Sequence, residues 1–122
     1  MPPAYNGRVR LGIDLGTTRV AVAAVDRGNY PIVSFDALDG SSREWFPSIV
    51  AERDGMVRTG FAAVNAVGHH GWRARRSLKR ALSDAGPTDT VFGRSVSELA
   101  TLFLADLAGA IRPLLGDLHL RR

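Results

Sequence analysis

The strongest constraint on the fold of this 122-residue chain is an alternating pattern that is interrupted by a short turn and then resumes. Apolar side chains alternate with polar or small ones from Arg8 to Asp14, and again from Val20 to Asp26. A period of two is typical of β-strands. We therefore expect Gly16, Thr17 and Thr18 to form a turn between two antiparallel strands, with their backbone N–H groups pointing outward together.

Further strands are predicted downstream of this turn. A third strand over Pro31 to Phe35 would complete a meander, and the polar stretch from Asp36 to Arg43 reads as a loop. Two short apolar runs, Ser48 to Ala51 and Met56 to Thr59, flank a glycine-containing turn and predict a hairpin.

Three segments have helical patterns. Phe61 to Val67 is short and alanine-rich, and Trp72 to Leu82 reads as a second helix. In the third, Ser95 and Glu98 fit a capping box before apolar residues at steps of three and four. That helix is expected to begin at Val96, to be kinked in its last turn by Pro113 and to stop at Gly116.

Composition narrows the function classes. No apolar run is long enough to span a membrane, and cysteine is absent, which rules out disulfides and fits the cytoplasm. The net charge is +4, but the arginines are scattered, so we do not expect nucleic acid as a partner. The pair His69 and His70 has no neighbouring carboxylate in the sequence, and we expect no metal there.

The first turn has the chemistry of a phosphate site. A glycine lets backbone N–H groups approach an anion closely, and two threonine hydroxyls add donors. The carboxylate of Asp14, at the end of the first strand, could hold hydrated Mg²⁺, which prefers oxygen ligands. On these residues alone, a plain hairpin with Gly16, Thr17 and Thr18 in its turn remains an equal alternative.

The longer pattern from Leu11 to Thr18 resembles the first phosphate motif of the superfamily that contains actin, sugar kinases and heat-shock protein 70. Three later segments, Phe46 to Val50, Gly60 to Ala63 and Ser77 to Leu82, resemble the heat-shock protein 70 chaperones in the same order. Sugar kinases of the FGGY type share only Asp14 to Thr18 of this series.

This resemblance implies a fold and a set of partners. The fold would be α/β, a mixed sheet with flanking helices, as in part of an actin-like (ribonuclease H-like) ATPase lobe. Its parts would be a phosphate-binding meander over 8–36, a small hairpin and helix subdomain over 46–83, and a long helix over 95–116. The partners would be ATP or ADP with Mg²⁺ and, in a longer protein, unfolded peptides and co-chaperones.

The resemblance also implies site residues. Asp14 would hold Mg²⁺ through water, and Gly16, Thr17 and Thr18 would cradle the phosphates. Lys79, the chain's sole lysine, would act on the transferred phosphate and promote hydrolysis. Arg19 departs from the family, which has Asn or Tyr there, and it would either add a phosphate contact or point to solvent.

Two other function classes stay open at this point, a segment of a sugar or acetate-type kinase and a basic nucleic-acid-binding module. The resemblance covers about the first third of an ATPase domain. We therefore expect residues 1–122 alone to bind ATP weakly and to have negligible ATPase activity. We also expect them to self-associate, through the apolar stripe of the long helix or through an open sheet edge.

Overall fold

The computed structural model describes residues 10–25, 28–86 and 88–120 of the chain. The elements are β1 (Arg10–Leu15), β2 (Arg19–Val25), β3 (Phe35–Asp36), β4 (Ser42–Arg43), β5 (Phe46–Pro47), β6 (Ile49–Arg53), β7 (Met56–Thr59), α1 (Gly60–Ala66), β8 (Arg73–Arg76), α2 (Leu78–Asp84), β9 (Thr90–Val91), β10 (Arg94–Ser95) and α3 (Val96–Leu120). The start of the first predicted strand, Arg8 and Val9, and the end of the second, at Asp26, lie outside the described residues.

The predicted hairpin of β1 and β2 is present. The two strands are antiparallel, with Asp14 opposite Ala21 and Gly12 opposite Ala23. The alternation predicted from the sequence sets the faces of β2, because Val20 and Val22 are fully buried.

The third strand of this sheet is not the predicted one. Ile32 makes only an isolated bridge to Ala23, and Phe35 begins the two-residue strand β3, which pairs with β4 inside the predicted loop. The named third strand is β5, which is antiparallel to the start of β2. The segment from Pro31 to Phe35 is therefore not a continuous strand.

A second sheet has the order β7-β6-β8. The hairpin of β6 and β7 is confirmed, but the helix predicted over Trp72 to Leu82 is wrong in its first half. Residues Arg73–Arg76 form β8, antiparallel to β6, and the helix α2 begins only at Leu78. Ladder hydrogen bonds to β6 and the ion pair between Arg73 and Glu52 hold this segment extended, against its local helix propensity.

Helix α3 begins as predicted. Ser95 Oγ accepts a hydrogen bond from Glu98 N–H at 3.1 Å, which is the N-cap contact, while the Glu98 carboxylate accepts from Arg94 at 3.1 Å. The predicted stop at Gly116 is wrong, since the helix runs through Pro113 to Leu120. A glycine inside a helix costs only about 1 kcal/mol relative to alanine, so a helix can end at a glycine but can also continue through it.

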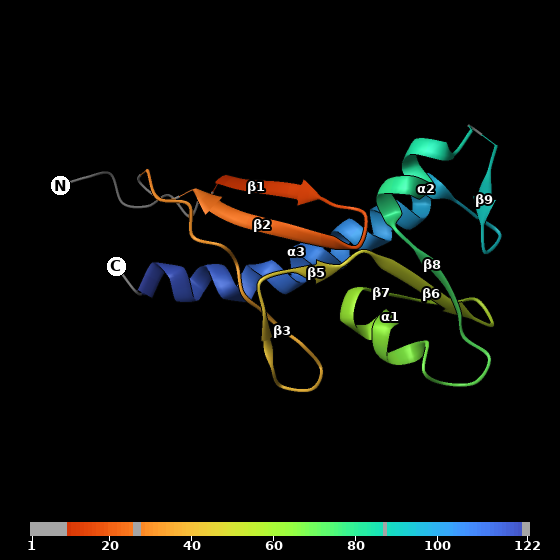
Figure 1. The fold of residues 1–122 in the computed structure, drawn as a ribbon, viewed down its shortest axis with the longest axis horizontal. Coiled ribbons are helices and arrows are strands. Elements are labelled where there is room, and N and C mark those ends of the chain that lie inside the picture. The colour runs from red at the N-terminus through yellow and green to blue at the C-terminus, as the bar shows by residue number, and fades with distance from the viewer. Residues whose placement is uncertain (1–9, 26–27, 87, 121–122) are drawn as a thin grey trace.

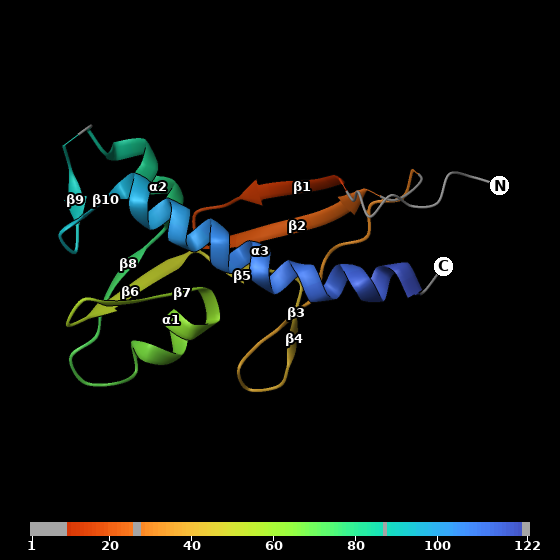
Figure 2. The ribbon, with the colours of Figure 1, turned by 180° about the vertical axis from the view of Figure 1, so that it is seen from behind.

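The long helix lies under the β1–β2 hairpin and reaches the second sheet (Figures 1 and 2). Its apolar stripe, which we expected to remain exposed, is buried in the chain's own core. This core joins residues from β2, the segment before β3, β3, β5, β6, α2 and α3, namely Val20, Val22, Val33, Phe35, Phe46, Val50, Leu78, Leu99, Phe103, Leu107 and Ile111. The stripe folds back over the sheets because burial removes its apolar surface from water.

A smaller apolar cluster lies under α1. The two helix residues Ala63 and Ala66 pack there against Ile49 and Ala51 of β6. The architecture is thus mixed α/β, with antiparallel sheets and helices, and it is compatible with part of an actin-like lobe. In the described part of the chain, no helix is both long enough and apolar enough to cross a bilayer.

Candidate phosphate-binding site

The turn between β1 and β2 is closed by a hydrogen bond in which Gly16 N–H donates to Arg19 C=O at 2.9 Å. The N–H of Gly16 is therefore used inside the turn and does not point outward to an anion, contrary to expectation. Within the described residues, no carbonyl accepts from the N–H groups of Thr17 and Thr18, and both threonines are exposed. The turn thus offers two adjacent N–H groups and two hydroxyls.

Asp14 lies two residues before this turn, near the end of β1. Its side chain is exposed, and its cross-strand neighbour is the small residue Ala21. Among the described residues, no ion pair or hydrogen bond engages its carboxylate. An exposed and unpaired carboxylate suits Mg²⁺, which keeps several of its waters and takes few protein ligands.

Ser48 connects the turn to the start of α2. Its N–H donates to Thr18 C=O at 3.1 Å, and its own C=O accepts from Ser77 N–H at 2.8 Å. Its hydroxyl accepts from Leu78 N–H at 3.0 Å. Because Ser48 is only 2% exposed, these bonds are shielded from water, and they fix the turn and the helix against one residue.

Lys79 is the second residue of α2, next to the residues that Ser48 holds. Its side chain is exposed. Figures 1 and 2 show the start of α2 beside the β1–β2 turn. The structure therefore brings the sole lysine and the threonine turn to one region of the molecule, although they lie about sixty residues apart in the sequence.

The start of α2 has a strained backbone. Ser77 has φ 63°, in the left-handed region that a non-glycine residue rarely adopts, at a cost of about 1–3 kcal/mol. Two contacts hold it there, the bond to Ser48 C=O and the N-cap bond in which Arg80 N–H donates to Ser77 Oγ at 3.2 Å. Strain of this kind is common where a chain holds a side chain for function.

The side chain of Arg19 contacts an aromatic ring. Its guanidinium lies 4.5 Å from the centroid of the half-buried Trp45 ring, and Trp45 in turn lies 5.9 Å from Phe61. In this cation–π contact the guanidinium keeps its charge, and no ion pair engages it among the described residues, so its N–H groups remain able to donate. Neither alternative from the sequence anticipated this aromatic partner.

The arginines of β8 divide into two kinds. Arg73 is engaged, because it forms an ion pair with the buried Glu52 and lies 5.0 Å over the Phe92 ring. Its hydrogen bond to the Glu52 carboxylate lowers the pKa of that group. Arg75 and Arg76 are exposed on the same strand.

The histidine pair belongs to no cluster of metal ligands among the residues that the structure describes. His69 Nδ1 lies 3.1 Å from Asn65 C=O, which can only accept, so this nitrogen is the protonated one. Across the described ranges, no three His, Asp or Glu side chains cluster as a metal site would require.

Sequence reasoning missed Ser48, Ser77 and Trp45 as parts of this site. The sequence analysis placed Ser48 at the start of a hairpin strand and in the family-like segment Phe46 to Val50, but it gave the residue no part in the site. Nothing local shows that a serine will bond two distant segments, because that role depends on which segments pack around it.

Comparison with curated proteins finds similarity to a chaperone. A "Chaperone protein HscA homolog" from Methylobacillus flagellatus is 37% identical over 89 residues. The match covers 69% of this chain but only 14% of that protein's length. No model of a known protein family matches the chain. The chain is thus distantly similar to a chaperone of the heat-shock protein 70 type.

Proposed function

We propose that this chain is the phosphate-binding segment of a nucleotide-binding ATPase of the heat-shock protein 70 type. The observation that carries the proposal is the pair of hydrogen bonds through Ser48, which join Thr18 of the turn to Leu78 beside Lys79. A plain hairpin has no need of a buried link to the helix that carries the only lysine. A phosphate site needs donors and a cation held in fixed relation.

Each residue has a role in this proposal. The Asp14 carboxylate would hold a hydrated Mg²⁺, and the N–H groups and hydroxyls of Thr17 and Thr18 would donate to phosphate oxygens. Gly16 would keep the turn tight enough to present them. Lys79 would place its ammonium where charge develops on the transferred phosphate.

Arg19 would act beside the turn. Its contact with Trp45 would hold the guanidinium beside the turn, where its N–H groups could donate to a phosphate oxygen. When bound, ATP would supply the phosphoryl group that is transferred, and ADP would be the leaving group. In a longer protein, the proposed activity is ATP hydrolysis by a cytoplasmic chaperone, with unfolded peptides and co-chaperones as partners.

The test is a titration of the isotopically labelled chain with Mg·ADP and Mg·ATP, followed by amide nuclear magnetic resonance. We expect shifts at Thr17, Thr18 and Ser48 and at the first turn of α2, with a dissociation constant in the roughly millimolar range. Weak binding is expected because the family holds its nucleotide between two lobes.

Matched variants separate the proposed site from general attraction of anions. Asp14→Asn is expected to remove the Mg²⁺-dependent part of the binding, whereas Asp36→Asn, another exposed aspartate, should leave it unchanged. Lys79→Ala should preserve most of the binding, because the lysine acts on the transferred phosphate. Shifts confined to Arg75 and Arg76, or no shift at millimolar nucleotide, would refute the proposal.

A further inference from the structure

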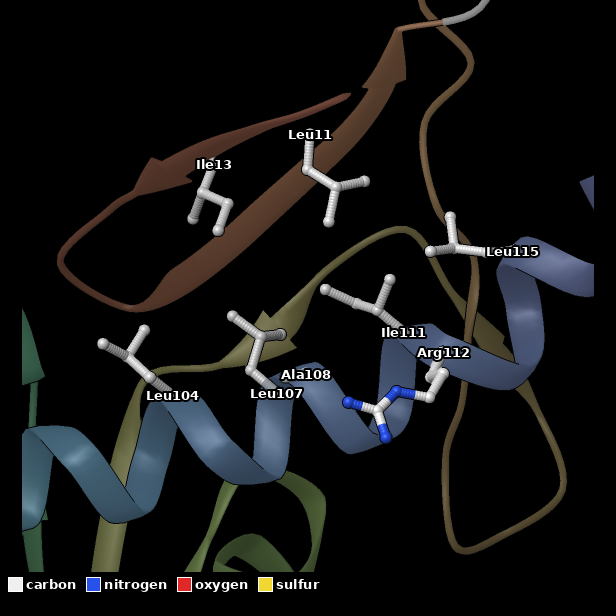
Figure 3. Close-up of a pocket in the computed structure, with 8 residues that line it drawn as sticks. All are labelled: Leu11, Ile13, Leu104, Leu107, Ala108, Ile111, Arg112 and Leu115. Carbon is white, nitrogen blue, oxygen red and sulfur yellow. The ribbon is translucent and has the colours of Figure 1, made fainter. Parts of the chain in front are cut away.

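The β1–β2 hairpin has two faces with different residues. The side chains of Leu11 and Ile13 point toward α3, as Figure 3 shows. Side chains alternate between the two faces of a strand, so Asp14 lies on the outer face, which is turned away from α3. Residues that are opposite each other in an antiparallel ladder share a face, and Asp14 is opposite Ala21. Arg19 is two residues before Ala21 on β2, and it therefore lies on the same outer face as Asp14.

Strand β5 brings an aromatic ring to this outer face. Arg19 is opposite Pro47, and Val20 is opposite Phe46, with both of the latter buried in the core. Trp45 directly precedes this strand. Its ring reaches the outer face, because the Arg19 guanidinium lies 4.5 Å from the ring centroid.

Arg19 and Asp14 are diagonal neighbours across β1 and β2. Asp14 is opposite Ala21, two residues from Arg19, and residues in this relation are roughly 7–8 Å apart, within reach of a long side chain. Opposite charges in these positions are expected to pair. Among the residues that the structure describes, however, neither side chain takes part in an ion pair. Arg19 contacts the Trp45 ring instead.

The Trp45 ring is anchored by aromatic contacts that continue into the core. It lies 5.9 Å from the ring of Phe61, which meets Phe46 edge-on at 5.5 Å. Phe46 in turn lies 5.6 Å from the fully buried Phe103. A Cβ at Gly60 would collide with the Phe46 ring, so this ring packs directly on the backbone at the start of α1. The aromatic partner of Arg19 is therefore fixed to the core.

We propose that Trp45 is a positioning residue of the phosphate site, which holds the Arg19 guanidinium and so prevents it from pairing with Asp14. The inference rests on the proposed function, because the carboxylate that stays unpaired is the one assigned to hydrated Mg²⁺. If the two side chains paired, their charges would cancel locally. Asp14 would then attract a cation less, and Arg19 would attract a phosphate oxygen less.

An ion pair and a cation–π contact compete for the same guanidinium. An exposed ion pair contributes little, because water screens the charges and a flexible arginine side chain loses freedom. Tryptophan is the strongest aromatic partner of a cation, and the contact strengthens as water is removed from it. Trp45 is half-buried and already held in place by Phe61. The ring therefore shifts the balance away from Asp14.

The first test needs neither metal nor nucleotide, so its outcome does not depend on the proposed function. It follows the Arg19 Nε–H resonance of the isotopically labelled chain and measures its response to Asp14→Asn. In the unmodified chain the response should be small, because Arg19 contacts the ring. In a Trp45→Leu background it should be severalfold larger, because Arg19 then pairs with Asp14. Equal responses in the two backgrounds would overturn the inference.

The second test measures the Mg²⁺-dependent part of ADP binding. Trp45→Leu should weaken it roughly two- to fivefold, the effect of one exposed ion pair, and Trp45→Phe should weaken it less because a ring remains. Adding Arg19→Gln to Trp45→Leu should restore it, since no guanidinium then competes for Asp14. A loss caused by disturbed packing would instead persist in the double variant.

Trp72→Leu is the matched control. Trp72 also has an arginine beside its ring, with Arg58 at 5.8 Å from the centroid, but it lies outside the hairpin, so its loss should leave the binding unchanged. Binding that Trp45→Leu does not weaken, or a loss that Arg19→Gln does not restore, would overturn the inference and leave the proposed function standing. No binding of Mg·ADP by the unmodified chain would refute the proposed function and, with it, the role of Trp45 toward Mg²⁺.

Discussion

Gly16 is needed by the turn itself, before any ligand is considered. A Cβ at this position would lie 2.6 Å from the backbone oxygen of Arg19, closer than real Cβ atoms come. That oxygen also accepts the Gly16 N–H, so neither partner can move away without opening the turn. The glycine was predicted from the sequence as part of a phosphate cradle, and the structure adds a second reason that the sequence alone does not reveal.

We therefore predict that Gly16→Ala lowers the free energy of unfolding by about 1–3 kcal/mol, the usual cost of forcing extra atoms into a packed site. Gly12→Ala is the matched control, because its Cβ meets nothing and its φ is not in the left-handed region. It should be neutral or slightly stabilising. Urea denaturation of dilute samples gives both values, and equal losses would contradict the steric argument.

Among the elements, the best predicted are those whose signals are local. The β1–β2 hairpin follows from alternation around Gly16, and the start of α3 follows from the cap at Ser95. Strand β8 could not be read locally, because Arg73 to Arg76 has good helix formers and no apolar alternation. Its extended form depends on the ladder with β6, which is more than twenty residues earlier in the chain.

In the candidate site, too, the residues with a local sequence signal were predicted and the contacts between distant segments were not. Asp14, Gly16, Thr17 and Thr18 were predicted together because they are contiguous. Their connection to α2 was not, since it passes through the buried Ser48.

Ser48→Ala tests this connection. The substitution removes the acceptor of Leu78 N–H, and Leu78 is only 4% exposed, so the donor is left buried without its partner. A loss of about 1–3 kcal/mol in the free energy of unfolding is expected. Hydrogen exchange should also accelerate at the start of α2 more than in β6. Ser97→Ala, an exposed serine on α3, is the control and should change stability by less than about 0.5 kcal/mol.

At the scale of the whole molecule, α3 holds the separate parts of the chain together. Its buried residues pack against the β1–β2 hairpin, the second sheet and α2 in one core. The sequence predicted the helix and its stripe but not what covers the stripe, because periodicity shows that a face is apolar without naming its partner.

Phe103 is at the centre of this core. It is fully buried, and its ring lies 5.6 Å from that of Phe46 at 73°, an edge-to-face arrangement. Phe103→Ala should lower the free energy of unfolding by about 3–5 kcal/mol, and Phe103→Leu by less, so the milder variant remains folded for comparison. Leu102→Ala, at a neighbouring position that is 39% exposed, should cost far less.

Hydrogen exchange in Phe103→Leu then decides whether the chain unfolds as one unit. Phe103 belongs to the same core as Val22 of β2 and Val50 of β6, which lie in different sheets. If α3 couples the sheets, protection of the Ala24 amide, which donates to Pro31 C=O, and of the Val50 amide should fall by the same factor, because both then exchange through global unfolding. A fall at Ala24 with Val50 unchanged, or the reverse, would mean that the two sheets are independent units and that the helix only connects them.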